Sequence, residues 1–110
     1  MDQCIFCKII NGEIPKEFLF ESENLVAFSD IHPSADIHIL IIPKQHIGGI
    51  GDLTPENAGL LSEIYSVVNK LVLENNLKEN SYRVVVNGGL AQHVPHIHFH
   101  LLGGKWYKFI

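Results

Sequence analysis

The chain has 110 residues, of which 46% are hydrophobic and 18% charged; this balance excludes a disordered chain and predicts one domain over residues 1–110. The formal net charge is −4 and no basic stripe is visible, so we expect no nucleic-acid partner. No run approaches the ~20 apolar residues that span a bilayer, and the N-terminal residues do not read as a secretory signal. We therefore expect a cytoplasmic protein that does not bind a membrane.

The first half of the chain predicts a short helix and three strands. The helix covers Cys4–Ile10, is capped by Asp2, and ends at an Asn-Gly pair. Two strands follow, over Phe18–Glu21 and Leu25–Asp30. The run Ile37–Pro43 is short, rich in isoleucine and ended by proline, which predicts a central strand.

The second half predicts one long helix and two further strands. The helix begins at Thr54-Pro55-Glu56, and apolar residues recur at helical spacing to about Leu73. The strands cover Tyr82–Asn87 and His96–Leu102, the latter closed by Gly103-Gly104. The predicted fold class is α+β: a mostly antiparallel sheet of five or six strands with one long and one short helix.

Three histidines alternate along the last predicted strand, at His96, His98 and His100. Side chains alternate faces along a strand, so these three are expected to share one face. The residues that alternate with them are expected to enter the core: Ile97, Phe99 and Leu101. Each neutral imidazole needs both a donor and an acceptor, so such a row is more typical of a reactive or metal-binding site than of packing.

Two kinds of chemistry fit this row. A neutral imidazole can attack a substrate and form a covalent intermediate, while a neighbouring imidazole protonates the leaving group. Alternatively, histidines on a strand can hold a catalytic zinc. Hydrolytic metal sites commonly include a carboxylate, and the sequence has no Asp or Glu after Ser81. This absence favours a histidine nucleophile over a catalytic zinc site.

The segment His96–Leu102 resembles the signature of the histidine triad family. In that signature a single hydrophobic residue separates successive histidines, and two hydrophobic residues follow the third histidine. Three other segments resemble the same family: Cys4–Pro15, Phe28–Pro33 and His38–His46. Gln92-His93-Val94-Pro95 also precedes the triad as in that family. The resemblance covers nearly the whole chain and is closest to the Hint branch of small, homodimeric nucleotide phosphoramidases.

The resemblance implies a role for each histidine. His98, at the centre of the triad, would be the nucleophile that attacks phosphorus. His100 would contact the phosphoryl or leaving group, His96 would contact phosphate or a metal, and His38 would orient the row. Asp30 would accept hydrogen bonds from the ribose hydroxyls, although an Asp before Pro33 can also simply start a turn.

The resemblance also implies a nucleotide pocket, whose base would be walled by Phe6, Ile9, Ile14, Phe28, Ile31 and Leu40. The loop before the triad would add further contacts, from Asn87, His93 and Val94. That loop departs from the family pattern: it is about two residues shorter, and Ala91 replaces a glycine. His93 stands where a hydroxyl residue often donates to the leaving group, and it could do the same or lie at the surface.

Cys4 and Cys7 are spaced to chelate a metal from one turn of helix. The family resemblance implies His46 and His96 as the remaining ligands of a structural Zn²⁺, a closed four-ligand site. Two alternatives remain open at this point: a pair of ordinary buried thiols, or a redox pair.

As a whole, the resemblance implies a hydrolase of purine nucleoside phosphoramidates or related AMP or GMP conjugates, acting through a nucleotidyl-histidine. A dinucleoside polyphosphate hydrolase, and a nucleotide-binding module with residual catalysis, are the alternatives. A homodimer is expected from the resemblance, and a small domain with open sheet edges and a long apolar helix face favours it.

Overall fold

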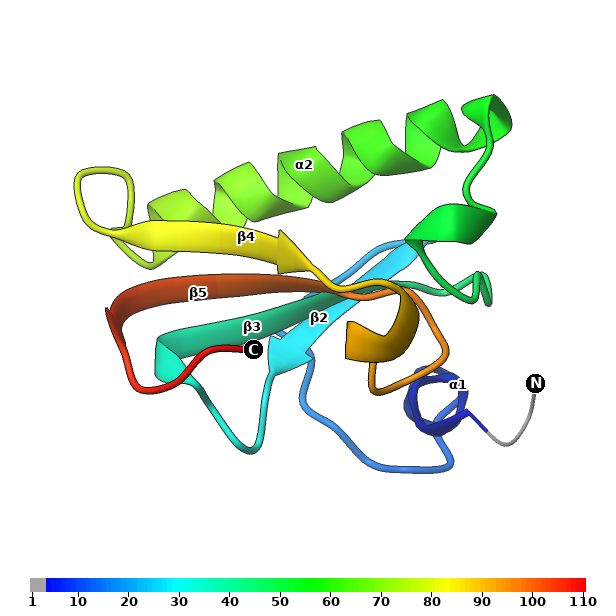
Figure 1. Cartoon of the computed structure of the whole chain (residues 1–110), viewed down its shortest axis with the longest axis horizontal. Coiled ribbons are helices and arrows are strands. Elements are labelled where there is room, and N and C mark those ends of the chain that lie inside the picture. The colour runs from blue at the N-terminus through cyan, green and yellow to red at the C-terminus, as the bar shows by residue number, and fades with distance from the viewer. Residues whose placement is uncertain (1–3) are drawn as a thin grey trace.

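The computed structural model describes residues 4–110, which form a five-stranded antiparallel sheet with a helix on each face (Figure 1). The strand order is β1-β2-β3-β5-β4. The elements are α1 (Ile5–Ile10), β1 (Phe20–Glu21), β2 (Leu25–Ser29), β3 (Ala35–Pro43), α2 (Ala58–Glu74), β4 (Tyr82–Val86) and β5 (Phe99–Trp106). The predicted fold class is confirmed.

The long helix α2 lies along one face of the sheet and closes the larger core (Figure 1). Its apolar residues recur at helical spacing, so one stripe of the helix is buried: Ile64, Val67, Val68, Leu71 and Val72. They pack on alternate residues of the strands, including Leu25, Ala27, Ile39, Ile41, Phe99 and Leu101. The core positions predicted for Ile97, Phe99 and Leu101 are thereby confirmed.

The other strand residues face the opposite side of the sheet, where the short helix α1 covers them (Figure 1). This smaller core joins Phe6 and Ile9 of α1 to Val26, Phe28, Leu40 and Ile42. Along β3, the side chain of His38 points to the same face as Leu40 and Ile42, and His100 on β5 lies directly opposite Leu40. The sheet therefore presents both histidines on the α1 side.

Both helices begin differently from the prediction. Cys4, not a residue before it, caps α1: its Sγ accepts the N–H of Cys7 at 3.4 Å. The predicted cap Asp2 lies outside the described residues. The turn Pro55–Asn57 is a 3-10 turn, held where the Thr54 N–H donates to Asn57 Oδ1 at 2.8 Å, and α2 proper starts at Ala58.

The first strand is also shorter than predicted. β1 covers only Phe20–Glu21; before it, the Leu19 N–H still donates to Ala27 O at 2.8 Å, and the ring of Phe18 stacks on Phe28 at a centroid distance of 6.2 Å. Within residues 4–110, neither helix is long and apolar enough to cross a membrane.

The last strand is displaced from its predicted range. β5 starts at Phe99, so His96–His98 are not part of the ladder, and it continues through Gly103-Gly104 to Trp106. Pro95 has no N–H to donate, and the Ile97 N–H donates instead to Ile47 O at 2.7 Å, which draws the chain away from β3. Gly104 takes φ +78°, and a Cβ there would lie 2.7 Å from Asp36 Oδ2, so the strand needs glycine at that point.

Candidate active site

Two pockets meet at the histidines on the α1 side of the sheet. An apolar pocket of about 400 Å³ extends toward α1, and a smaller polar pocket of about 280 Å³ extends toward the chain segment after β5. Five side chains line both pockets: Asp30, His32, His93, His98 and His100. A ligand that fills the apolar pocket therefore has its other end beside His98 and His100.

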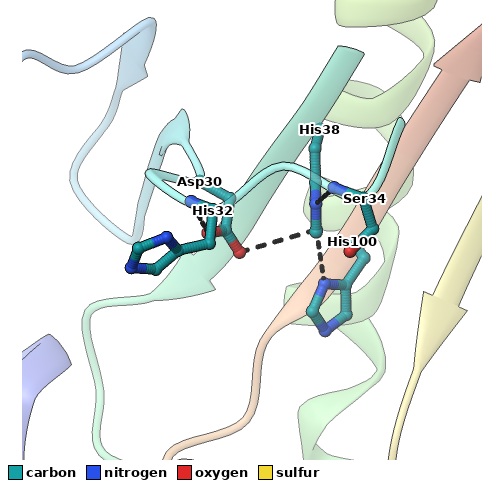
Figure 2. A network of polar contacts seen from close by, with 5 residues as sticks. All are labelled: Asp30, His32, Ser34, His38 and His100. Carbon is teal, nitrogen blue, oxygen red and sulfur yellow. Dashed lines mark hydrogen bonds and ion pairs between the residues drawn. The ribbon is translucent and has the colours of Figure 1, made fainter. Parts of the chain in front are cut away.

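A chain of hydrogen bonds fixes the protonation of His38 (Figure 2). The backbone N–H of Ser34 can only donate, and it lies 3.0 Å from His38 Nδ1, so that nitrogen must accept. The proton of neutral His38 is then on Nε2, which lies 2.9 Å from His100 Nδ1. His38 therefore donates to His100.

The same bond determines which nitrogen of His100 carries a proton. Because Nδ1 accepts from His38, the proton of neutral His100 is on Nε2. Within residues 4–110, that buried Nε2 has no hydrogen-bond partner. Buried donors are nearly always satisfied in proteins, so an orphan N–H that lines both pockets is a candidate contact for a bound substrate.

His98 has the complementary arrangement. Its Nδ1 lies 2.9 Å from the carbonyl oxygen of His96, which can only accept, so Nδ1 carries the proton. Nε2 of His98 is then an unprotonated lone pair. The rings of His98 and His100 are 4.9 Å apart between centroids, which brings a nucleophilic nitrogen and a proton donor to one place.

The surroundings keep these imidazoles neutral near pH 7. Burial lowers the pKa of His98 and of His38, although the carboxylate of Asp30 opposes part of each shift. Burial, together with the neighbouring His98 and His38, lowers the pKa of His100 to about 4. Only a neutral imidazole has the lone pair needed for attack, so burial favours the reactive form.

Asp30 lies where β2 ends and supplies the carboxylate that the sequence around the histidines lacks. Its Oδ2 is 3.6 Å from His38 Nε2, and its Oδ1 accepts the N–H of His32 at 2.8 Å (Figure 2). The turn-forming role is therefore real, but the carboxylate also lines both pockets. One ligand atom from each of Asp30, His38 and His100 lies within 4.8 Å of the other two, so these three residues could in principle hold a metal ion. However, His38 Nε2 and His100 Nδ1 face each other in a hydrogen bond.

The apolar pocket brings together nearly all the residues predicted to bind a nucleotide. They are Phe6, Ile9, Ile14, Phe28, Asp30, Ile31, Leu40, His93 and Val94. Phe6 forms edge contacts with both Phe28 and His98, so the pocket wall touches the candidate nucleophile. Ile31 is 72% exposed and stands at the pocket rim. Asn87 lines the polar pocket instead.

Sequence reasoning missed several side chains that line the two pockets: Ile5, Lys16, His32, Ser34, Lys108, Phe109 and Ile110. The turn after Asp30 offered a signal for His32 and Ser34, because it connects two predicted strands at the site. The tail gave none. It folds back because the Tyr107 N–H donates to Ser34 O at 2.7 Å and the Tyr107 hydroxyl donates to Asp36.

A second cluster lies behind the triad, where α1 meets the end of β3. Cys4 Sγ is 3.4 Å from His96 Nδ1, and Cys7 Sγ is 3.5 Å from the same atom and 3.3 Å from His46 Nδ1. His96 is 0% exposed, and its Nε2–H donates to Pro43 O at 2.8 Å, so Nδ1 offers its lone pair to the thiols. His96 is therefore turned away from His98 and His100.

Comparison with known proteins shows the family and the fold. The family model described as "Scavenger mRNA decapping enzyme C-term binding" matches residues 3–108. The HIT family hydrolase of Legionella pneumophila superposes with a TM-score of 0.91 at 45% identity, covering 96% of each chain. A histidine triad protein of Clostridium difficile also has a TM-score of 0.91, at 38% identity, and covers 100% of this chain and 97% of its own.

The chain belongs to the histidine triad family. Among curated histidine triad relatives, the purine nucleoside phosphoramidase of Escherichia coli K12 is 39% identical over 108 residues, which cover 94% of this chain and 89% of that protein. Family membership and these neighbours identify a HIT family hydrolase.

In this histidine triad protein the shortened loop before the triad is free of backbone strain at Ala91. Gly89 takes the left-handed conformation, with φ +59°, and Gly89–Ala91 form a 3-10 turn that alanine adopts readily. The Gln92 side chain then ties the loop down, donating to Gly48 O at 2.6 Å and to Val94 O at 2.8 Å. The replacement of glycine by Ala91 is thus accommodated.

Proposed function

We propose that this protein hydrolyses purine nucleoside phosphoramidates or related nucleotidyl conjugates, with His98 as the nucleophile. One observation carries the proposal: His98 presents an unprotonated Nε2 and His100 a protonated, unpartnered Nε2 beside a pocket of about 400 Å³. Nucleophilic displacement at phosphorus needs both groups at the same place. The Escherichia coli relative named purine nucleoside phosphoramidase supports the choice of substrate.

In the first step, the lone pair of His98 Nε2 attacks the α-phosphorus and the P–N bond breaks. The electron pair of that bond stays on the departing amine, which takes the proton of His100 Nε2 as it leaves. His100 is then an imidazolate, and its negative charge is balanced by the positive charge that forms on the ring of His98. The nucleotidyl-imidazole is a cation, and its Nδ1–H remains bonded to the carbonyl oxygen of His96. That carbonyl stabilises the charge that develops on the ring.

In the second step, a water molecule attacks the phosphorus and the bond to His98 Nε2 breaks. His100 Nε2 is now unprotonated and takes one water proton, while the oxygen remains on the released nucleoside monophosphate. Both histidines return to their starting protonation states. His38 holds His100 in the required tautomer throughout, because its Nδ1 is fixed as an acceptor by Ser34.

A burst experiment tests the proposal. Adenosine 5′-phosphoramidates of a fluorescent amine, mixed rapidly with enzyme, should release amine in a burst of about one equivalent per active site if the second step is slower. Water labelled with ¹⁸O should place the label on the nucleoside monophosphate in either case. Failure of the protein to cleave any purine phosphoramidate would refute the proposed function.

We further propose that Cys4, Cys7, His46 and His96 hold a structural Zn²⁺. Tetrahedral geometry with Zn–S of about 2.3 Å and Zn–N of about 2.0 Å would separate sulfur and nitrogen ligands by roughly 3.5 Å. The observed sulfur–nitrogen distances of 3.3–3.5 Å fit, and the four ligand atoms lie within 4.8 Å of one another. A bound ion would tie α1 to the triad segment and takes no part in the chemistry of His98.

We also propose a homodimer that covers the β4 edge and the outer side of α2. The strand order leaves β4 with a neighbour on one side alone, and an open edge is commonly covered in stable proteins. Large apolar or aromatic side chains are exposed nearby, at Tyr65, Leu73 and Tyr82. Light scattering at micromolar concentration should give the mass of two chains; a monomer would contradict this proposal.

A further inference from the structure

Lys16 contributes a cation to the wall of the apolar pocket. Its Nζ lies 5.1 Å from the centroid of the Phe28 ring, within the range of a cation–π contact. Phe28 is itself almost fully buried, at 2% exposure, so its ring is a fixed surface. The contact holds the ammonium of Lys16 beside the pocket and leaves its three hydrogens able to donate to a ligand.

Lys16 lines the apolar pocket and not the polar pocket. The polar residues of the apolar pocket other than Lys16 also line the polar pocket, so they mark the phosphate end: Asp30, His32, His93, His98 and His100. The remaining lining side chains are apolar. The proposed function puts the phosphate at the histidines, and the family resemblance implies that the ribose binds at Asp30. We therefore assign the base to the part of the apolar pocket that Lys16 lines.

Among the described residues, no carboxylate competes for Lys16. The lysines found in ion pairs are Lys44 with Glu21 and Lys70 with Glu74. An ammonium lined by apolar groups interacts more strongly with a ligand than one surrounded by water, because the local dielectric constant is lower. Lys16 can therefore discriminate between bases, whereas the apolar walls contact any purine ring in the same way.

The two common purines differ at the edge that a cation would recognise. Guanine and hypoxanthine present two acceptors side by side, O6 and N7, and a lysine ammonium pairs with them readily. Adenine presents N7 beside the N6 amino group, whose hydrogens point toward an approaching ammonium. An ammonium at the base end thus favours a 6-oxopurine.

We propose that Lys16 is a specificity-determining residue that selects nucleotides of 6-oxopurines by donating to O6 and N7 of the base. This inference rests on the proposed function for the orientation of the nucleotide, and it narrows the substrate class to guanosine and inosine conjugates.

Calorimetric titration of the whole protein with GMP, IMP and AMP tests the inference, because binding needs no turnover. The wild type should bind GMP and IMP about five- to tenfold more tightly than AMP, the effect of one partly exposed charge-assisted hydrogen bond. Lys16→Met keeps the aliphatic stem against Phe28 and should abolish the preference. Lys16→Arg should retain it, and kcat/KM for guanosine and adenosine phosphoramidates should follow the same order.

Lys78→Met is the matched control, since Lys78 is exposed after α2 and lines neither pocket while the change in net charge is the same. It should keep the wild-type preference. Equal loss of GMP and AMP binding in Lys16→Met, or no preference in the wild type, would overturn the inference and leave the proposed hydrolase intact. Failure of all three nucleotides to bind would instead refute both.

Discussion

His38 and His100 share one hydrogen bond of 2.9 Å whose direction is set by a backbone amide four residues before His38. The Ser34 N–H makes His38 Nδ1 an acceptor, so His38 Nε2 is the donor and His100 must keep its own proton on Nε2. Ser34 and His38 therefore set the tautomer in which His100 can protonate a leaving group, and neither of them contacts the substrate in the proposed mechanism.

His38→Ala removes the donor that fixes the tautomer of His100. General acid catalysis contributes roughly 10²–10⁴-fold to a reaction rate, and His100 in the wrong tautomer loses part of that contribution. We therefore expect kcat to fall by about ten- to a hundredfold. Binding of GMP should change by less than about twofold, because the apolar pocket is intact. A variant with unchanged kcat, or one that loses affinity and kcat alike, would show that His38 does not act through His100.

Asp30→Asn tests the ribose contact. A carboxylate accepts two hydroxyl hydrogen bonds with its charge, and losing the charge should weaken nucleoside monophosphate binding by roughly ten- to fiftyfold. The same monophosphate lacking both ribose hydroxyls serves as the control, since it should bind wild type and variant with similar affinity. If Asp30→Asn weakens both ligands equally, the carboxylate acts elsewhere, through His38 at 3.6 Å for example.

Acid should begin to destabilise the fold near pH 6.5, before most carboxylates titrate. His100 has its pKa lowered to about 4, chiefly by burial, whereas an unfolded histidine titrates near 6.5. Between these values the unfolded chain binds a proton that the native chain does not, so stability falls as the pH drops through this window. The loss from His100 is on the order of 3 kcal/mol at most.

Denaturant titrations at a series of pH values check this expectation. The free energy of unfolding should be level above about pH 7 and decline between about pH 6.5 and pH 4. His38, His96 and His98 contribute in the same direction, because burial lowers each of their pKa values too. In His100→Asn the decline should be shallower, and a slope identical to that of the wild type would contradict the assignment.

Metal removal should lower stability without stopping catalysis. If Cys4, Cys7, His46 and His96 bind zinc, elemental analysis should give about one ion per chain, and chelation should lower the melting temperature. Cys4→Ser combined with Cys7→Ser should lose the metal and the stability together. Protein that stays folded should remain active, because His98 attacks as an imidazole. Activity that vanishes on chelation and returns with zinc, with the fold unchanged, would point to a catalytic metal.

Sequence alone predicted the features that depend on local pattern. The apolar spacing of α2, the short isoleucine-rich run of β3, and the alternation that puts Phe99 and His100 on opposite faces of the sheet could all be recognised in the sequence, because helix and strand periods follow from backbone geometry. The family resemblance also grouped Phe6, Phe28 and Leu40 in one pocket, and they line it.

What sequence could not give depends on tertiary contacts. The Ile97 N–H pairs with Ile47 O, so β5 starts only at Phe99, and no sequence pattern marks that bond. The rotation of His96 away from His98 follows from its bonds to Pro43 and Cys4, which lie far from it in the sequence. The cation–π contact of Lys16 with Phe28 likewise depends on how the segment between α1 and β1 packs against β2.

Trapping the covalent intermediate and locating it tests most directly whether His98 is the nucleophile. Wild-type protein should be quenched in acid-free denaturant within milliseconds of mixing with a guanosine phosphoramidate, digested at alkaline pH, and analysed by mass spectrometry. We expect one nucleotidyl group on His98 of the wild type, and neither adduct nor turnover in His98→Ala. That variant should keep its core intact, because His98 packs on the pocket side of the sheet. An adduct on another residue, or turnover like that of the wild type in His98→Ala, would contradict this assignment.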